Sequence, residues 1–181
     1  MMNSKSQIRK DIKNIIKTNK KDFVIDELIE FIDGKNIAVY LDIKNEISID
    51  NVINNIKNKC NLFVPYMKDD GTNKIENALL EFKKYDLNKL CFDDFNIKSS
   101  NGEVIDIKDL DMIIIPGLAF NHLGYRMGYG KGCYDKALKN YDKMIIGVCY
   151  DNCFIDVMFH EEHDIRVDYV FTEKRFIKIR G

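Results

Sequence analysis

The stretch that decides the fold is DMIIIPGLAFNHLGYRMGYGKGCYD, which runs from Asp111 to Asp135. Its first part, Met112–Ile115, is a short apolar run of the kind that is buried inside a parallel sheet, and Pro116-Gly117 ends it. Beyond Cys133 a helix is predicted as far as Tyr141, because helical spacing relates Tyr134, Ala137, Leu138 and Tyr141. The stretch therefore predicts a buried strand, a polar loop and then a helix.

Within that loop, glycines alternate with larger residues at Gly128, Gly130 and Gly132. Glycine lets a backbone turn sharply and approach a bound group with no side chain in the way. A glycine-rich loop that leads into a helix also points N–H groups and the positive end of the helix dipole at one place. With Arg126 and Lys131 beside it, the loop predicts a phosphate site, although G-x-G-x-G alone also fits a flexible surface loop.

Two widespread phosphate-binding motifs do not fit this loop. The P-loop pattern fails because Gly124 is one residue too far from Gly130-Lys131, and Gly132 follows the lysine where Ser or Thr is needed. The dinucleotide fingerprint G-x-G-x-x-G fails because Cys133 occupies its last position.

Composition limits the classes of protein that remain. The chain has 181 residues, 45% of them hydrophobic, which predicts one domain spanning residues 1–181. Its net charge of −1 shows no excess of basic residues of the kind that binds nucleic acid. It has neither a membrane-spanning apolar run nor the apolar core of a signal peptide, so we expect no membrane partner and a cytoplasmic location. The five cysteines lack C-x-x-C spacing and are interpreted as reduced thiols.

Periodicity divides the rest of the chain into alternating helices and strands. Helices are predicted from Ser4 onward, from Val24 to Ile32, and after Ser48, which we expect to cap the third. Further strands are predicted at the ranges Asn36–Leu41, Asn61–Met67, Met144–Tyr150 and Tyr169–Thr172. This alternation predicts a three-layer α/β fold with a mainly parallel sheet.

The segment from 68 to 109 gives weak signals. A small antiparallel flap is predicted there, because Asn101-Gly102 between short alternating runs is typical of a hairpin turn. Just before the segment, Pro65 suggests the end of a strand or an edge strand.

The run PGLAFNHLGYRMGYGKGCYD, from Pro116 to Asp135, resembles the signature of 5-formyltetrahydrofolate cyclo-ligases, also called methenyltetrahydrofolate synthetases. The family pattern is close to PGLAFDxxGxRLGxGxGYYD. Two further segments resemble the family in the right order, Lys5-x-x-x-Arg9 and His163 to Thr172. The resemblance implies a Rossmann-like fold and the conversion of 5-formyltetrahydrofolate to 5,10-methenyltetrahydrofolate, with ATP going to ADP and phosphate through a phosphorylated formyl intermediate.

The resemblance also implies the ligand contacts. ATP contacts are expected at Lys5, Arg9, Arg126, Met127, Gly128, Tyr129, Gly130, Lys131, Gly132, Cys133 and Tyr134. Contacts with the reduced folate substrate are expected at Leu41, Glu46, Tyr129 and Lys131. Mg²⁺, which prefers oxygen ligands, is expected at Asp135 and Asp164. Lys131 and Tyr134 are predicted to lie nearest the transferred phosphoryl group.

Departures from the family include Asn121 in place of Asp, Cys133 in place of Tyr, and Tyr129 at a variable position that is often Arg. We hypothesise that Tyr129 stacks on a flat ligand ring, an interaction that needs no charge. In addition, Asn96–Ser99 replaces the Gly-Ile-x-Glu-Pro segment that family members usually carry.

Two alternatives come from other functional classes. One is a folate- or nucleotide-binding regulator without turnover, and the intact Arg126, Lys131, Asp135 and Asp164 argue against it. The other is a sugar-phosphate isomerase on a similar fold, and the lack of an obvious general base in the loop argues against that. We expect a monomer.

Overall fold

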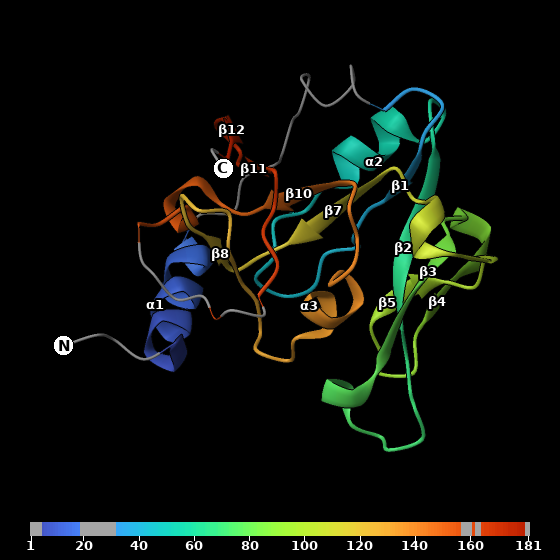
Figure 1. Ribbon diagram of the computed structural model, residues 1–181, viewed down its shortest axis with the longest axis horizontal. Helices are drawn as coiled ribbons and strands as arrows, with labels where there is room; N and C mark the ends of the chain where they lie inside the picture. The colour runs from blue at the N-terminus through green and yellow to red at the C-terminus, as the bar shows by residue number, and fades with distance from the viewer. Residues whose placement is uncertain (1–4, 19–31, 157–160, 162–163, 180–181) are drawn as a thin grey trace.

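The computed structural model describes residues 5–18, 32–156, 161 and 164–179 (Figure 1). The helix predicted from Val24 to Ile32 lies outside the described residues except for Ile32, and so does His163. An eight-stranded sheet forms the centre of the molecule, in the order β12-β11-β10-β7-β1-β2-β3-β6. Its strands are β1 (Asn36–Ala38), β2 (Asn61–Lys68), β3 (Leu79–Lys84), β6 (Val104–Ile105), β7 (Met112–Pro116), β10 (Met144–Val148), β11 (Tyr169–Phe171) and β12 (Phe176–Lys178).

The middle of this sheet is parallel and its margins are antiparallel. Strands β11, β10, β7, β1 and β2 pair in parallel, whereas β12, β3 and β6 are each joined to their neighbour by antiparallel pairing. Strand β7 is buried along its whole length, as expected for a strand covered on both faces. The predicted α/β fold with a mainly parallel sheet is therefore confirmed.

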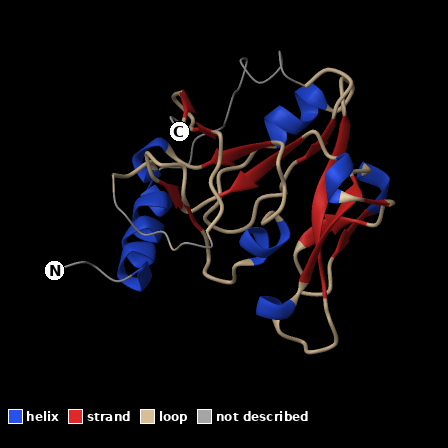
Figure 2. Ribbon diagram, viewed as in Figure 1, coloured by secondary structure: helices blue, strands red, loops and turns tan. Residues whose placement is uncertain are grey.

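Few α-helices accompany this sheet in the described part of the chain (Figure 2). They are α1 (Lys5–Thr18), α2 (Asp50–Ile56) and α3 (Cys133–Ala137). Helix α1 buries Ile12 and Ile16, and α2 buries an apolar face against the core. The predicted cap of α2 is wrong in detail: Ile49 is the N-cap residue and makes no side-chain cap bond, while the Ser48 hydroxyl accepts a bond of 3.4 Å from the Asp50 N–H. None of the helices in the described ranges combines the length and apolar character needed to cross a bilayer.

A topological switch point lies at β1. The chain passes from β1 to β2 on one side, and later returns to place β7 on the other side. In open α/β sheets, the crevice beyond the carboxyl ends of the strands at such a point is where ligands bind. The loops that leave β1 after Ala38 and β7 after Pro116 both open into this place.

Strands β2 and β3 form a hairpin that extends beyond the parallel strands (Figure 1). Pro65 lies inside this hairpin and not at a sheet edge, but pairing with β1 ends at Phe63, so the missing N–H of Pro65 breaks no bond to β1. The hairpin tip carries the short helix η2 (Ile75–Asn77). A second hairpin, β4 (Leu90–Phe92) with β5 (Lys98–Ser100), packs beside it, which confirms an antiparallel flap in this segment.

The predicted turn at Asn101-Gly102 does not join two paired strands. Strand β5 pairs with β4, whereas β6 pairs with β3, so the residues on either side of the turn have different partners. A Cβ atom on Gly102 would lie 2.2 Å from the carbonyl oxygen of Lys84. Only glycine lets the backbone at residue 102 pass this close to β3, and this requirement explains the Asn101-Gly102 pair.

Phe120, in β8 (Ala119–Phe120), anchors the long loop after β7 to the core. Its ring is fully buried, and a Cβ atom on Gly117 or Gly147 would lie 2.4 Å from ring atoms. The two glycines therefore make room for the ring, and the start of the loop is fixed against β10.

Candidate active site

A pocket of about 740 Å³ opens at the switch point. Its walls come from α1, the loop after β1, the β2–β3 hairpin, the glycine-rich loop and the segment that contains residues 161 and 164. The lining residues are Lys5, Arg9, Ile43, Glu46, Met67, Ile75, Ile97, Arg126, Met127, Gly128, Tyr129, Gly130, Lys131, Gly132, Cys133, Tyr134, Asp135, Lys136, Lys139, Glu161 and Asp164. All the residues predicted for ATP and Mg²⁺ are in this set.

The glycine-rich loop rests on α1. The Arg9 Nε donates to the Gly128 carbonyl at 3.0 Å, and Gly130, with φ of +88°, lies against the Arg9 guanidinium, which a Cβ atom would approach to 3.2 Å. Gly132, with φ of +66°, then begins α3. That helix has only five residues and ends before Tyr141, so it is shorter than predicted and its dipole is correspondingly small. Attraction for phosphate must come mainly from side-chain cations and loop N–H groups.

Arg126, in β9 (Arg126–Met127), is a largely buried cation in the pocket wall. Its Nη2 lies 3.3 Å from the Asp135 carboxylate, and the two side chains are 10% and 16% exposed. Its Nη1 donates to the Pro116 carbonyl at 3.3 Å, and its guanidinium lies 5.0 Å from the centre of the Tyr134 ring. Within the described ranges its Nε is buried without a hydrogen-bond partner. A ligand that brings an acceptor to this wall would satisfy that donor.

Two further carboxylates pair with Lys5 at the mouth of the pocket. The Lys5 ammonium lies 2.6 Å from Glu161 and 3.6 Å from Asp164. Asp135 accepts a bond of 3.4 Å from the N–H of Ile165, the residue that follows Asp164. Asp135 and Asp164 therefore approach one pocket wall, where they offer the oxygen donors that Mg²⁺ prefers. In the described part of the chain, no cluster of three or more potential metal ligands occurs, so a metal here would need oxygens from a bound ligand.

Glu46 supplies a different carboxyl group to the same pocket. Burial raises its pKa from 4.5 to about 7, although the Ile43 N–H bond and the nearby Arg126 act in the opposite direction. The Ile43 N–H donates to the carboxylate at 3.1 Å. Burial also raises the pKa of Tyr134 well above its ordinary value, so that phenol stays protonated and acts as a donor. The pocket therefore combines a cationic wall with one carboxyl group that titrates near neutral pH.

The β2–β3 hairpin closes one side of the pocket, and sequence reasoning missed it. Met67 and Ile75 from the hairpin and Ile97 from the neighbouring one line the pocket. Glu76 lies 3.2 Å from the Lys131 ammonium, its carbonyl accepts from Lys136, and the Cys133 thiol lies 3.6 Å from the Ile75 carbonyl. No pattern in residues 68–109 indicated that this tip would reach the glycine-rich loop.

Comparison with known proteins gives the family. Residues 1–173 match the model of the 5-formyltetrahydrofolate cyclo-ligase family. The chain belongs to this family. A 5-formyltetrahydrofolate cyclo-ligase from Mycoplasma genitalium is 34% identical over 126 residues, which cover 65% of this chain and 60% of that protein. One from Mycolicibacterium smegmatis is 36% identical over 39% of this chain and 38% of that protein. The matched part thus spans less than two thirds of either relative.

A solved structure supports the same grouping over almost the full length. The NMR structure of a 5,10-methenyltetrahydrofolate synthetase from Aquifex aeolicus superposes with a TM-score of 0.75 at 27% identity. The match covers 98% of this chain and 93% of that one. The family expected from the signature between Pro116 and Asp135 is therefore confirmed.

Within this cyclo-ligase fold, two predicted substrate contacts have unexpected surroundings. Leu41 is buried in the core and is not among the pocket-lining residues. Tyr129 lines the pocket, but its hydroxyl donates to the Lys44 carbonyl in the loop after β1. The roles of both residues in binding folate stay predictions.

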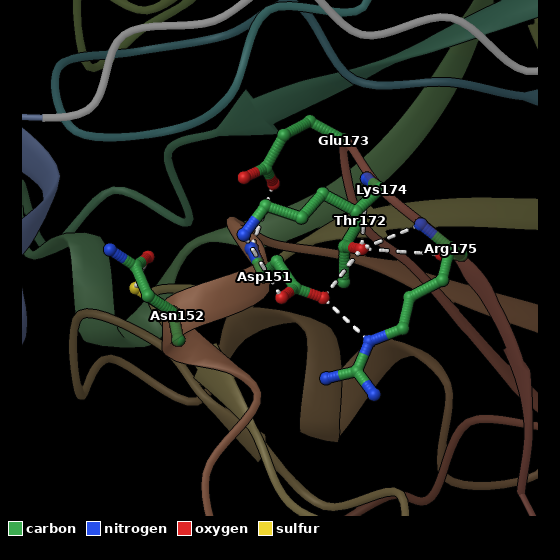
Figure 3. Close-up of polar contacts among 7 residues, drawn as sticks. Asp151, Asn152, Thr172, Glu173, Lys174 and Arg175 are labelled. Atoms are coloured by element: carbon green, nitrogen blue, oxygen red, sulfur yellow. Dashed lines mark hydrogen bonds and ion pairs between the residues drawn. The ribbon is translucent and has the colours of Figure 1, made fainter.

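A polar cluster supports α1, the helix that carries Lys5 and Arg9. Helix α1 packs against η5 (Asp151–Cys153), and Asp151 accepts bonds from Arg175 Nε at 2.6 Å and from the Thr172 hydroxyl at 3.1 Å (Figure 3). Sequence analysis did not single out Asp151, because its partners lie more than twenty positions along the chain. The cluster ties the end of β10 to the turn after β11 and so fixes the surface on which α1 rests.

Proposed function

We propose that the chain is an ATP-dependent 5-formyltetrahydrofolate cyclo-ligase that forms 5,10-methenyltetrahydrofolate, ADP and phosphate. One observation carries the proposal: a single pocket at the switch point gathers the glycine-rich loop, a buried cation at Arg126, two carboxylates at Asp135 and Asp164, and Glu46. Membership of the family supports the same activity.

The reaction needs activation of a poor leaving group. The formyl oxygen of the substrate attacks the γ-phosphorus of ATP, the bond to the ADP oxygen breaks, and ADP leaves. N10 of the same folate then attacks the formyl carbon and loses its proton, and the carbon–oxygen bond breaks to release phosphate. No protein nucleophile is required, so catalysis consists of alignment and neutralisation of charge.

The chain's own groups suit those tasks. Lys131 would neutralise charge on the moving phosphoryl group, and the Arg126 Nε, which is unpaired among the described residues, would donate to an acceptor at the pocket wall. Tyr134 is a protonated phenol and would donate a hydrogen bond; it would not act as a base. Lys5 and Arg9 would hold the remaining phosphates from the side of α1, with the loop from Met127 to Cys133 against the nucleotide.

Folate and metal would occupy the two ends of the pocket. Glu46, once ionised, would accept paired hydrogen bonds from the pterin, with Leu41 packed behind it and Tyr129 beside it. Asp135 and Asp164 would hold Mg²⁺, which supplies positive charge to the phosphate oxygens when bound.

We also propose that the protein acts as a monomer in the cytoplasm. All five cysteines are free in the structure, which suits a reducing compartment.

The deciding experiment is an absorbance assay for the methenyl product. Product should form only with ATP and Mg²⁺ present, one ADP per product, and should stop in excess EDTA. Full turnover in EDTA would exclude the role of Mg²⁺. Binding of both ligands without any product would favour the non-catalytic, regulatory alternative instead.

A further inference from the structure

Tyr129 joins two loops that leave different strands. Its backbone lies in the glycine-rich loop between β9 and α3, and its hydroxyl donates to the carbonyl of Lys44 in the loop after β1. The side chain is 36% exposed, and the Lys13 ammonium lies 5.1 Å from the centre of its ring. Burial raises the pKa of Tyr129 to about 12, so the hydroxyl keeps its proton and stays a donor at physiological pH.

On one side of this bond, Lys44 sits in a closed turn that also carries Glu46. The Glu46 N–H donates to the Ile43 carbonyl at 3.0 Å, and the Ile43 N–H returns a bond of 3.1 Å to the Glu46 carboxylate. Asn45 holds the turn with φ of +73°. Because the turn is closed on itself, a displacement of the Lys44 carbonyl moves the Glu46 carboxyl group with it.

On the other side, Tyr129 lies between two glycines that contact Arg9. Gly128 accepts the Arg9 Nε bond, and Gly130 lies on the Arg9 guanidinium. The glycines have no side chains that could hold this part of the loop by packing, so polar contacts contribute to holding it in place. The Tyr129 hydroxyl ties this loop to the turn of Glu46.

We propose that Tyr129 is a positioning residue that couples the two ligand sites, so that nucleotide bound at the glycine-rich loop orders the Glu46 turn for the pterin, and the pterin in turn orders the loop. The inference rests on the proposed function, because it takes the loop as the nucleotide side and Glu46 as the folate side.

The test measures coupling directly. The dissociation constant of AMP-PNP, a non-hydrolysable ATP analogue, is determined with Mg²⁺ in the absence and presence of saturating 5-formyltetrahydrofolate. In the wild-type protein each ligand should lower the dissociation constant of the other by the same factor, as thermodynamic linkage requires. Tyr129→Phe, which removes one hydroxyl, should reduce that factor by about two- to tenfold, the range for one hydrogen bond. Its affinity for either ligand alone should change less than the coupling factor.

Tyr141→Phe is the matched control. The Tyr141 hydroxyl also donates to a backbone carbonyl, that of Leu110 at 3.2 Å, but just before the amino end of β7 and away from the pocket. This variant should keep the wild-type coupling factor even where its melting temperature falls. Coupling lost equally in both variants would show a general structural effect and overturn the proposal.

The remaining outcomes separate this inference from the proposed function. If the wild-type protein forms product and Tyr129→Phe keeps the wild-type coupling factor, the proposed coupling through Tyr129 is overturned and the proposed cyclo-ligase function is not. This outcome would also favour simple stacking of the ring on a ligand, which phenylalanine preserves. A wild-type protein that binds neither ligand would overturn both.

Discussion

Glu46 is a carboxyl group whose charge depends on where the fold places it. Taken as a loop residue in the sequence, it is an ordinary solvated glutamate. In the pocket, burial raises its pKa to about 7, and the opposing effects of the Ile43 N–H bond and of Arg126 do not cancel that rise. The group is therefore poised to change charge when a hydrogen-bond donor such as a pterin edge enters the pocket.

We expect Glu46→Gln to change both stability and binding. Between pH 4.5 and about 7 the folded chain keeps a proton on Glu46 that the unfolded chain releases. Its contribution to stability is therefore fully present below pH 4.5 and is lost as the pH rises through 7. Glutamine does not ionise, so Glu46→Gln should not lose this stability as the pH rises. Its free energy of unfolding at pH 8.5 should therefore exceed that of wild type by as much as about 3 kcal/mol. Urea unfolding at pH 5 and 8.5 measures it.

Glu46→Gln should also weaken the binding of 5-formyltetrahydrofolate by about 1.5–3 kcal/mol, the range for a hydrogen bond to a charged group. Calorimetry with AMP-PNP is the control, because nucleotide affinity should stay at the wild-type value. A variant that loses nucleotide binding and keeps folate binding would reverse the assignment of Glu46.

At the scale of elements, the β2–β3 hairpin changes what the glycine-rich loop can do. Its tip places Glu76 against Lys131, which with Tyr134 is expected nearest the transferred phosphoryl group. Both side chains are about half exposed, 48% and 51%, so the pair is screened by solvent and weak. Lys131 is therefore held by a carboxylate that a phosphate can displace.

Glu76→Gln should lower the dissociation constant of AMP-PNP by up to about fivefold, because it removes the carboxylate that competes with phosphate for Lys131. Fluorescence or calorimetric titration at low salt measures the change, which should shrink as ionic strength rises. Glu81→Gln is the matched control: Glu81 lies on the same hairpin and pairs with Lys68 at 3.0 Å, and neither residue lines the pocket. Weaker nucleotide binding by Glu76→Gln would mean that Glu76 positions Lys131 for its ligand.

At the scale of the whole molecule, the pocket is completed by segments from both ends of the chain. Helix α1 reaches it through Arg9 on Gly128 and through Lys5 on Glu161 and Asp164. The element η5, which carries Asp151 of the polar cluster in Figure 3, also packs against this helix. Ligand binding should therefore change the local stability of segments that lie far apart in the sequence.

We expect AMP-PNP with Mg²⁺ to slow hydrogen exchange in α1 as well as in the glycine-rich loop. At a concentration of about 100 times its dissociation constant, the ligand should add about 2.7 kcal/mol to the free energy of unfolding. Mass spectrometry of exchange locates the protection. Arg9→Met should remove the protection of α1, whereas β10, which is buried in the core, should exchange slowly with or without ligand. Unchanged exchange in wild-type α1 would show that the helix does not contact the nucleotide.

By itself the sequence determined the features that contiguous residues carry. The run from Asp111 to Asp135 predicted the buried strand, the loop and the helix start, and its resemblance predicted the family. Apolar periodicity located α1 and the parallel strands, because burial on one or both faces repeats with the period of the backbone. The residues between Arg126 and Asp135 could be expected to act together since they are neighbours in sequence.

Only the tertiary structure decided how distant segments meet. It placed the antiparallel strands β3, β6 and β12 at the margins of the sheet, brought Glu76 to Lys131, and joined Tyr129 to Lys44. It also buried Glu46 deeply enough to raise its pKa, which no local pattern indicates. The physical reason is that such contacts depend on strand order and register, and hydrophobic periodicity records which face of a segment is buried but not which other segment covers it.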